Sequence, residues 1–415
     1  MRLSRRRFVG TLTGASVATI TGTQRLFAQN NESIRVGLLA AKTGPLASGG
    51  IDMDLALTMF LKERENVLAG RKVELIVADT AGVPATARTK AQELIEKNNV
   101  HCIIGPLAAF EALAIDDYVR SSRTPILSVA GAEDMTQRKP NPWFVRPSCT
   151  SAQPSHPMGD YAANALKYKR VATIGDDFAF GHECVAGFHR VFEDNGGKVV
   201  QKLWTPLNAP DYGTYISQLK TDIDAVFTAH AGSNGFKFIR QLREYGNRTQ
   251  ILGGFTPVDE SLLQQMGDDA LGAMTGSWYS AELDYPVNKT FVEAIRREYR
   301  LDPGVYAAET YVCGEVLEHA AKAVNGKIED KDTFIKALRE AKVPDTLRGP
   351  VRFDELGNAV GNIYIRKVEK KNGKYVNAVI KTYPDVSQFW TYGKDAFLKN
   401  PVYSRDYPPA KNLEQ

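Results

Sequence analysis

The chain has 415 residues, of which 43% are hydrophobic and 24% charged, an ordinary globular balance with length enough for two domains. Its formal net charge of +4 comes from the start of the chain: residues 1–28 contain five arginines and no acidic residue, which leaves 4 − 5 = −1 for the rest. A body so close to neutral argues against nucleic acid as a partner, because neutralising phosphates requires a basic surface.

Residues 1–28 have the pattern of an export signal. Adjacent arginines in SRRRFVG (4–10) precede a mildly apolar run over 11–23, and LFA ends at Ala28, where we expect cleavage. This pattern resembles a twin-arginine signal, and the alternative is a basic disordered tail. No later stretch has the roughly 18 uninterrupted apolar residues of a spanning helix. We therefore expect a soluble mature protein in the periplasm.

From residue 33 onward, short apolar runs alternate with helix-length amphipathic runs. Strands are predicted at 34–40, 72–79, 101–105, 125–130 and 143–147, and the helices between them at 51–66, 84–97 and up to about residue 120. Near-continuous runs of β-branched residues indicate strands that are covered on both faces, as in a parallel sheet. The alternation of strand and helix is typical of a doubly wound α/β domain.

A second series of the same kind begins after residue 147. Helices are predicted at 157–168, 181–196, 212–220 and 234–246, and strands at 170–177, 198–204, 224–230 and 250–254. Beyond residue 278 two long helices follow each other at 288–300 and 307–326, then come a strand within 349–358 and a hairpin over 363–384 that turns at Asn372-Gly373. The Pro-rich end, 403–415, is expected to be loose.

The motifs of enzymes and metal sites are missing from the sequence. The four cysteines form no CxxC pair, although the export route permits a disulfide and leaves open whether Cys149 and Cys184 pair. In HECVAGFH the second histidine, His189, comes seven residues after His182, too far for a zincin site. No GxSxG, GxxxxGK[ST] or GxGxxG pattern occurs. We therefore expect no catalytic residue, no cofactor and no metal.

Five stretches in chain order carry a family resemblance: 34–50, 72–106, 125–136, 170–181 and 349–358. Together they resemble the type I periplasmic solute-binding proteins, specifically the Leu/Ile/Val-binding family that serves ABC importers. The resemblance implies two α/β lobes, each with a doubly wound parallel sheet, joined by a three-crossing hinge near 146–151, 276–282 and 347–352. The N-terminal lobe would take 33–147 and 280–345, the C-terminal lobe 148–278 and 349–390, and 391–415 would be a tail.

The stretch IIGPLAAFEA (103–112) fits a carrier better than an enzyme. It reads as a strand, a turn and a helix start, with no nucleophile, acid or base among its small and apolar side chains apart from Glu111 within the helix. Such a tip binds anions through the free amides of the helix's first turn. Small residues such as Ala109 let a ligand approach the backbone. The alternative is that Ala108 and Ala109 simply pack under Phe110.

The resemblance also implies how the family's amino-acid binders hold their ligand: Ser or Thr hydroxyls bind the carboxylate, and an acid of the second lobe binds the ammonium. In this sequence Ala109, Ala132 and Phe255 stand at or near those positions. Polar groups are costly to bury unless a ligand pairs with them, so these changes favour a small carboxylate with an aromatic or apolar body. The alternative is that Asp259 or Glu133 replaces the missing acid and the ligand is a branched-chain or other amino acid.

All the candidate ligand-binding residues come from segments that are expected to face the cleft. They are Ser48, Ala109, Phe110, Ala130, Gly131, Ala132, Phe180, His230, Phe255 and Asp259. Ser48 would supply a hydroxyl, and His230 would either donate to a carboxylate or phenol or cap the next helix. Arg146, at the first crossing, is expected to be structural.

We expect a monomer that delivers its solute to an ABC permease complex in the inner membrane. A ligand sensor that docks on a membrane signalling partner is the alternative, because the same fold serves both. An enzyme on this scaffold ranks third.

Overall fold

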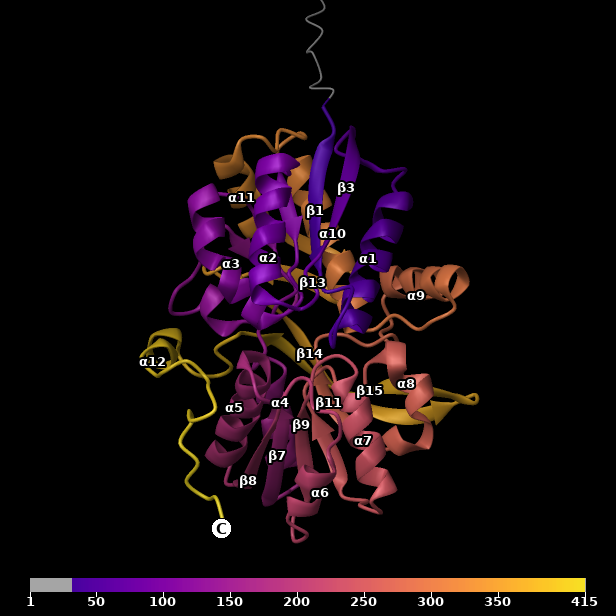
Figure 1. Cartoon of the computed structure of the whole chain (residues 1–415), viewed down its shortest axis with the longest axis vertical. Helices are drawn as coiled ribbons and strands as arrows, with labels where there is room; N and C mark the ends of the chain where they lie inside the picture. Colours follow the sequence, from indigo (N-terminus) through magenta and orange to yellow (C-terminus); the bar gives the residue numbers. More distant parts are fainter. Residues whose placement is uncertain (1–31, 415) are drawn as a thin grey trace, which may run out of the picture. The chain divides into compact units, whose positions relative to one another are not determined.

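The computed structural model describes residues 32–414, so the predicted export signal lies outside the described residues. Ser33–Gln415 forms one unit, which is built on two β-sheets (Figure 1). In the described part of the chain no helix is both long and apolar enough to cross a membrane.

The first sheet is parallel except at one edge. Its strands run in the order β2-β3-β1-β4-β5-β6 and are β1 (Ile34–Ala40), β2 (Val67–Leu68), β3 (Arg71–Asp79), β4 (Cys102–Ile104), β5 (Ile126–Leu127) and β6 (Phe144–Val145); β2 alone is antiparallel. The helices between them are α1 (Ala47–Lys62), α2 (Pro84–Gln92) with a π-helical turn Glu93–Lys97, and α3 (Ala109–Ser122). Six of the seven β1 residues are buried, as expected for a strand covered on both faces.

The second sheet has a parallel part of the same design and an antiparallel extension. Its parallel strands run in the order β11-β10-β9-β7-β8 and are β7 (Arg170–Asp176), β8 (Lys198–Thr205), β9 (Ala225–Ala229), β10 (Gln250–Gly253) and β11 (Met274–Ser277). The helices among them are α4 (Ser155–Asp160), α5 (Ala179–Asp194), α6 (Gly213–Gln218), α7 (Asn234–Glu244) and α8 (Glu260–Met266).

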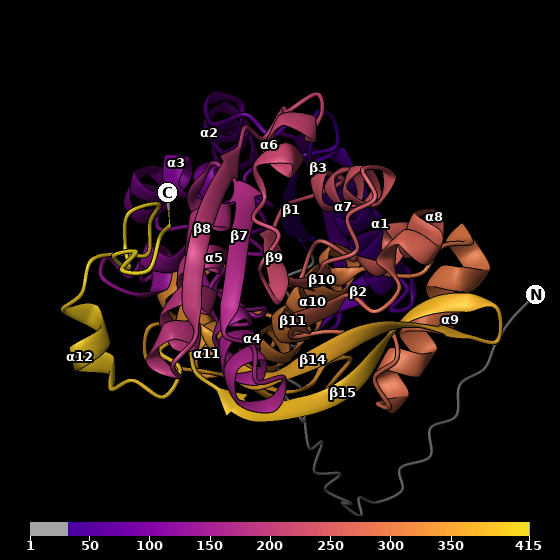
Figure 2. The same cartoon turned by 90° about the horizontal axis from the view of Figure 1, so that it is seen from below.

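The extension consists of β12 (Lys342–Thr346), β13 (Gly349–Phe353), β14 (Ala359–Lys371) and β15 (Lys374–Val386), all paired antiparallel, with β14 next to β11 (Figure 2). The predicted hairpin turn is confirmed: Asn372 and Gly373 both have positive φ, 51° and 79°, which suits the turn type that Asn-Gly favours.

The three helices between β11 and β12 pack against helices that belong to the first sheet, although they follow the second sheet in the chain. They are α9 (Pro286–Tyr299), α10 (Val305–Ala323) and α11 (Lys331–Arg339). Helix α10 lies against α1, and its Cys313 Sγ is 3.9 Å from the Leu127 carbonyl oxygen of β5. We call the first sheet with α1–α3 and α9–α11 the first lobe, and the second sheet with α4–α8 the second lobe. The predicted two-lobe α/β fold is confirmed.

The connections between the lobes contact one another. Arg348 is buried and its guanidinium donates to the carbonyl oxygens of Pro147 and Ser148, at 3.0 and 2.5 Å. The same guanidinium lies 4.8 Å from the ring centre of Trp278. Residues of all three predicted crossings therefore meet at one point, which is the place for a hinge.

The C-terminal tail begins with α12 (Lys394–Leu398). Residues 403–414, expected to be loose, form no helix or strand, but Tyr403 is buried in a small cluster with Phe389 and Phe397. Near the end, Glu414 pairs with Arg170 of β7 at 2.5 Å. The prolines suggested a disordered tail, but the aromatic residues between them bury enough apolar surface to hold the segment on the second lobe. The four cysteines all lie in the described part and are free and buried, so Cys149 and Cys184 are not paired.

Candidate ligand-binding cleft

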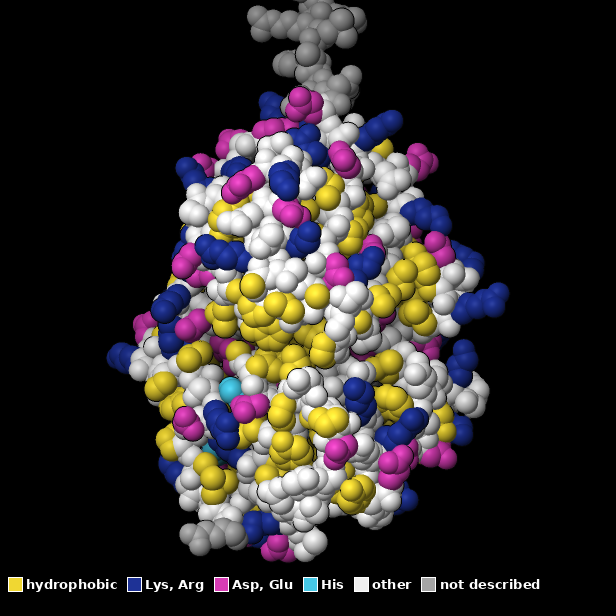
Figure 3. Space-filling model, viewed as in Figure 1, with side chains coloured by type: hydrophobic (Ala, Val, Ile, Leu, Met, Phe, Trp, Pro, Cys, Tyr) yellow, Lys and Arg dark blue, Asp and Glu magenta, His cyan; other side chains and the backbone are white. Residues whose placement is uncertain are grey.

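An apolar pocket lies where the two lobes meet. Its cavity volume is about 20 Å³, so the lobes lie close together around it. Its lining consists of Leu46, Leu107, Ala108, Ala109, Val129, Gly131 and Tyr306 from the first lobe and Phe178, Phe180, Ala231 and Phe255 from the second. Figure 3 shows hydrophobic side chains gathered between the two lobes on the face in view.

Topology explains why these residues meet. Apart from Tyr306, each lies in the turn, or in the first two residues of the helix, that follows the carboxyl end of a parallel strand: β1, β4 and β5 in one sheet, and β7, β9 and β10 in the other. Parallel strands bring such turns to one edge of the sheet, where open α/β folds bind ligands. Here two such edges face each other, so each lobe supplies half of the pocket.

The turn after β4 approaches the rest of the first lobe closely. Gly105 has φ +104°, and a Cβ there would overlap the carbonyl oxygen of Leu39. Helix α3 then begins at Ala109, and the buried carboxylate of Glu111 accepts the Ala108 N–H at 2.9 Å. The Glu111 N–H donates to the Ala108 carbonyl oxygen at 3.1 Å, so the Ala109 and Phe110 amides are the ones left without an acceptor in the described part of the chain, beside the pocket. This turn therefore offers backbone donors and small side chains to a ligand.

The second-lobe wall is aromatic. Phe178 and Phe180 are stacked with ring centres 6.0 Å apart, and Phe180 meets Phe255 edge-on at 5.5 Å. Phe110 of α3 reaches across from the first lobe and contacts Phe178 edge-on at 5.3 Å. Such edge-to-face pairs hold rings in defined orientations. The pocket is thus walled by phenylalanine rings that support one another.

Tyr306 brings a hydroxyl to the pocket. It lies in the first turn of α10, and its hydroxyl is near the backbone of Gly232 in the second lobe. Burial strongly raises the pKa of this phenol, so it stays protonated. Sequence reasoning missed Tyr306 because α10 follows the second lobe in the chain; it also missed Phe178, which the aromatic pair in DDFAFG (176–181) could have indicated.

Four of the predicted residues line the pocket: Ala109, Gly131, Phe180 and Phe255. Phe110 lies behind the lining against Phe178. Three others do not line it. Ser48 lies in the first turn of α1, and the carbonyl oxygens of Ala130 and Ala132 accept from the buried guanidinium of Arg146.

His230 is engaged within the second lobe, which corrects its predicted role. Its Nε2 is 3.1 Å from Thr205 Oγ1, and its Nδ1 is 2.6 Å from Thr228 Oγ1. The ring is fully buried, and burial lowers the pKa of the imidazole to about 3. Both ring nitrogens are therefore occupied, and the neutral ring neither faces the pocket nor caps a helix.

Neither carboxylate that was considered for an ammonium reaches the pocket. Asp259 accepts from Ser261 and from the backbone of Val305, and Glu133 is fully buried, where it accepts the Ala152 N–H at 3.1 Å. Among the described residues, those that line the pocket carry no charged side chain. An amino-acid ammonium would therefore have no carboxylate partner here.

Arg146 has the structural role that its position suggested. Its guanidinium donates to the Ala130 carbonyl oxygen at 2.8 Å and to Asn358 Oδ1 at 2.8 Å, so it ties the first crossing to the β13–β14 turn. Elsewhere in residues 32–414, no group of three or more His, Cys, Asp or Glu side chains is arranged to hold a metal ion.

Comparison with known proteins identifies the family. Residues 33–374 match the family model described as periplasmic binding protein. The chain belongs to this family, as a type I protein of the Leu/Ile/Val-binding group. A curated relative is the "Leu/Ile/Val-binding protein homolog 6" of Brucella abortus (strain 2308), 28% identical over 360 residues, which cover 84% of this chain and 91% of the relative.

Two solved structures of similar proteins contain aromatic acids. A solute-binding protein of an ABC transporter from Rhodopseudomonas palustris BisB5, in complex with 3,4-dihydroxybenzoic acid, is 34% identical with a TM-score of 0.82 and covers 86% of this chain and 98% of that one. Its counterpart from R. palustris HaA2, in complex with p-hydroxybenzoic acid, is 27% identical with a TM-score of 0.79 over 86% and 99%.

Proposed function

We propose that this periplasmic binding protein is the substrate-binding component of an ABC importer and that it captures a small aromatic or apolar carboxylate between its lobes. The observation that carries the proposal is the composition of the pocket. Its lining combines three phenylalanine rings with small residues beside a helix N-terminus and, among the described residues, no charged side chain.

Each half of the pocket suits one part of such a ligand. The amides at the start of α3, helped by the helix dipole, would bind the carboxylate. Phe178, Phe180 and Phe255 would bury the ring, and burying one apolar side-chain-sized group contributes about 1.5–3 kcal/mol. The Tyr306 hydroxyl is the polar side chain available to a ring substituent. The benzoic acids bound to the R. palustris proteins support this ligand class.

Branched-chain amino acids are the second candidate, because curated relatives are named Leu/Ile/Val-binding proteins. A side-by-side screen separates the two. Purified mature protein is titrated with benzoate, 4-hydroxybenzoate and cinnamate and, in parallel, with leucine and valine, while its melting temperature is followed. A ligand at a hundred times its Kd stabilises the folded form by about 2.7 kcal/mol. We expect the aryl acids to raise the melting temperature; a rise with leucine or valine alone would contradict the proposal.

Export, delivery and release are parts of the same proposal. Replacing the three arginines at 5–7 by lysine is expected to keep the protein out of the periplasmic fraction, because twin-arginine export depends on arginine.

The ligand is expected to leave chemically unaltered, which mass spectrometry of the released molecule checks. We propose that a monomer docks on a permease complex; growth on the aryl acid that is lost when the chain is deleted would favour transport over a sensor role.

A further inference from the structure

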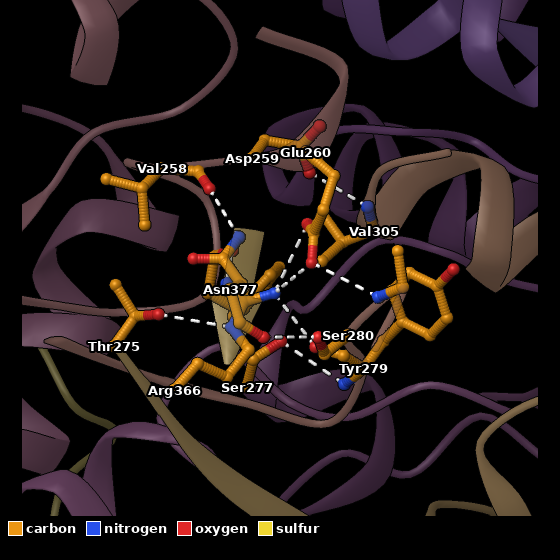
Figure 4. A network of polar contacts seen from close by, with 12 residues as sticks. Val258, Asp259, Glu260, Thr275, Ser277, Tyr279, Ser280, Val305, Arg366 and Asn377 are labelled. Atoms are coloured by element: carbon orange, nitrogen blue, oxygen red, sulfur yellow. Dashed lines mark hydrogen bonds and ion pairs between the residues drawn. The ribbon is translucent and has the colours of Figure 1, made fainter. Parts of the chain in front are cut away.

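The turn between β10 and α8 contacts both lobes. It carries Phe255, which lines the pocket, at one end and Asp259, the N-cap residue of α8, at the other. Figure 4 shows this turn with the residues that hold it, and shows the Asp259 carboxylate close to the backbone of Val305. Since Val305 belongs to α10 of the first lobe, the turn spans the distance between the lobes beside the pocket.

Asp259 supplies a cap that α10 lacks. The residue before α10 is Gly304, which has no side chain, and the Val305 N–H instead donates to Asp259 Oδ2 at 2.8 Å. The first amides of a helix have no intrahelical acceptor, and the helix dipole favours negative charge at this end. The acceptor for a first-lobe helix thus comes from the second lobe, one residue away from Tyr306 in the pocket.

Gly304 is shaped for this contact. Its φ of −90° and ψ of −173° are extended backbone that other residues adopt. A Cβ at this position, however, would overlap the Asp259 carboxylate, with Oδ1 as the nearest atom. Glycine is therefore required at this position by the close approach of Asp259, and not by the backbone conformation.

Buried polar residues fix the turn on the second-lobe side. Arg366 of β14 is fully buried, and its guanidinium donates to the Phe255 carbonyl oxygen at 3.0 Å and to Glu260 at 3.1 Å. The side-chain amide of Asn377 in β15 donates to the Val258 carbonyl oxygen at 2.8 Å (Figure 4). Asp259 itself accepts from the amide and the hydroxyl of Ser261, at 3.0 and 2.7 Å. The carboxylate is therefore held in place before it meets α10.

We propose that Asp259 is a closure latch, a positioning residue that caps α10 when the lobes come together and so stabilises the closed cleft without touching the solute. This inference rests on the proposed function only in that a solute binds between the lobes. A latch acts on the equilibrium between open and closed forms, so its loss weakens every ligand by the same factor. A residue that contacts the ligand would weaken some ligands more than others.

The test compares Gly304→Ala and Asp259→Asn with two matched controls. Gly393→Ala replaces the N-cap glycine of α12, where an added Cβ meets nothing within 4 Å. Asp330→Asn alters a cap that accepts the Thr333 N–H of its own helix, α11, within the first lobe. Affinity and dissociation rate are measured for benzoate, 4-hydroxybenzoate and leucine, and solution scattering gives the radius of gyration with and without ligand.

We expect both latch variants to weaken each ligand that binds by about the same factor, roughly tenfold for the loss of a cap, with faster dissociation. The ligand-free proteins should show a larger radius of gyration than the wild type. Unchanged affinity and radius, or weakening confined to one ligand, would overturn the latch. If only leucine binds, the proposed ligand class is wrong, but the affinity of leucine for the variants still tests the latch. If none of the three ligands binds, solution scattering of the ligand-free proteins tests the latch.

Discussion

The two walls of the cleft are built on opposite principles. The first-lobe wall after β4 is a close-packed turn with small side chains, where backbone amides are the functional groups. The second-lobe wall after β10 is a turn that carries Phe255 and is held from behind by the buried ion pair of Arg366 and Glu260. A binding pocket without charged lining residues thus still depends on charged side chains, which lie one layer behind the surface that the ligand touches.

Breaking the ion pair behind the second-lobe wall is expected to cause the largest loss of stability. Arg366→Met leaves the fully buried Glu260 without its cation, and breaking one partner of a buried pair costs about 3–5 kcal/mol. Urea unfolding measures this loss. Arg352→Met is the control, since its pair with Asp385 is exposed and should matter by less than about 0.5 kcal/mol. Equal losses for the two variants would show that the wall does not depend on its buried charges.

The next effect concerns the amides of the first wall. Ala109→Asp places a carboxylate at the first residue of α3, a position that acidic residues favour in helices. The helix N-terminus offsets part of the cost of a charge at this buried position, and circular dichroism checks that the fold survives. The new charge occupies the place proposed for the ligand's carboxylate. We expect calorimetry to show at least about a hundredfold loss of aryl-acid affinity. Leu113→Asp, on the exposed face of the same helix, should bind as the wild type does.

The aromatic wall predicts a smaller loss. Phe255→Ala removes one ring from the pocket, and losing about 1.5–3 kcal/mol of burial weakens aryl-acid binding about 10- to 100-fold. Phe236→Ala on α7, whose ring lies under Arg240 outside the pocket, is the matched control. Should calorimetry give both variants the wild-type affinity, Phe255 is no part of the site.

The stability of the fold is expected to depend on pH through Asp52, which lies near Asp259. Asp52 of α1 has a buried Oδ2 without a partner in the described part of the chain, and burial, followed by the nearby Asp259, raises the pKa of Asp52 to about 8. Ser261 is the hydrogen-bonding neighbour of Asp52, and Asp259 in turn lies near Tyr306 of α10 and Glu260, which is paired with Arg366. The folded form therefore keeps a proton that the unfolded chain releases near pH 4.

The stability that comes from this proton is fully present below pH 4 and is lost as pH rises through 8. Between pH 4 and 8, the free energy of unfolding of the wild type, measured with urea, should fall by up to about 1.4 kcal/mol per pH unit more than that of Asp52→Asn. Parallel pH profiles for the two proteins would show that Asp52 is ionised in the fold.

The smallest expected effect is that of Ser48→Ala. Ser48 was a candidate from the sequence, but it lies in the first turn of α1 and does not line the pocket. Calorimetry should give an affinity within about twofold of the wild type, a difference below 0.5 kcal/mol. A larger loss would place the ligand closer to α1 than the pocket suggests.

The sequence predicted most of the fold because its signals are local. Alternating strands and helices, the Asn372-Gly373 hairpin and the two long helices after residue 278 all follow from periodicity and turn chemistry. The helices α8 and α11, the strands β2, β11 and β12 and the packed end of the chain were missed. Helix α8 is short, and the segment 391–415 is ordered by contacts with residues more than 200 positions away, such as Arg170.

The candidate site was predicted in part for the same reason. Phe180, Phe255, Ala109 and Gly131 were found because strand ends can be located from the sequence. His230 was misjudged because one of its partners, Thr205, ends β8, which is separated from β9 by β7 in the sheet, and such a contact leaves no local pattern. The contact of Asp259 with Val305 joins segments 46 positions apart, and no local pattern indicates it.

The central claim, that the cleft closes over an aryl acid, is tested most directly by a crystal structure of the mature protein with benzoate. The account predicts the carboxylate within about 3 Å of the first-turn amides of α3, and the ring against Phe180 and Phe255. A benzoate that lies outside this pocket, or whose carboxylate points away from α3, would contradict it.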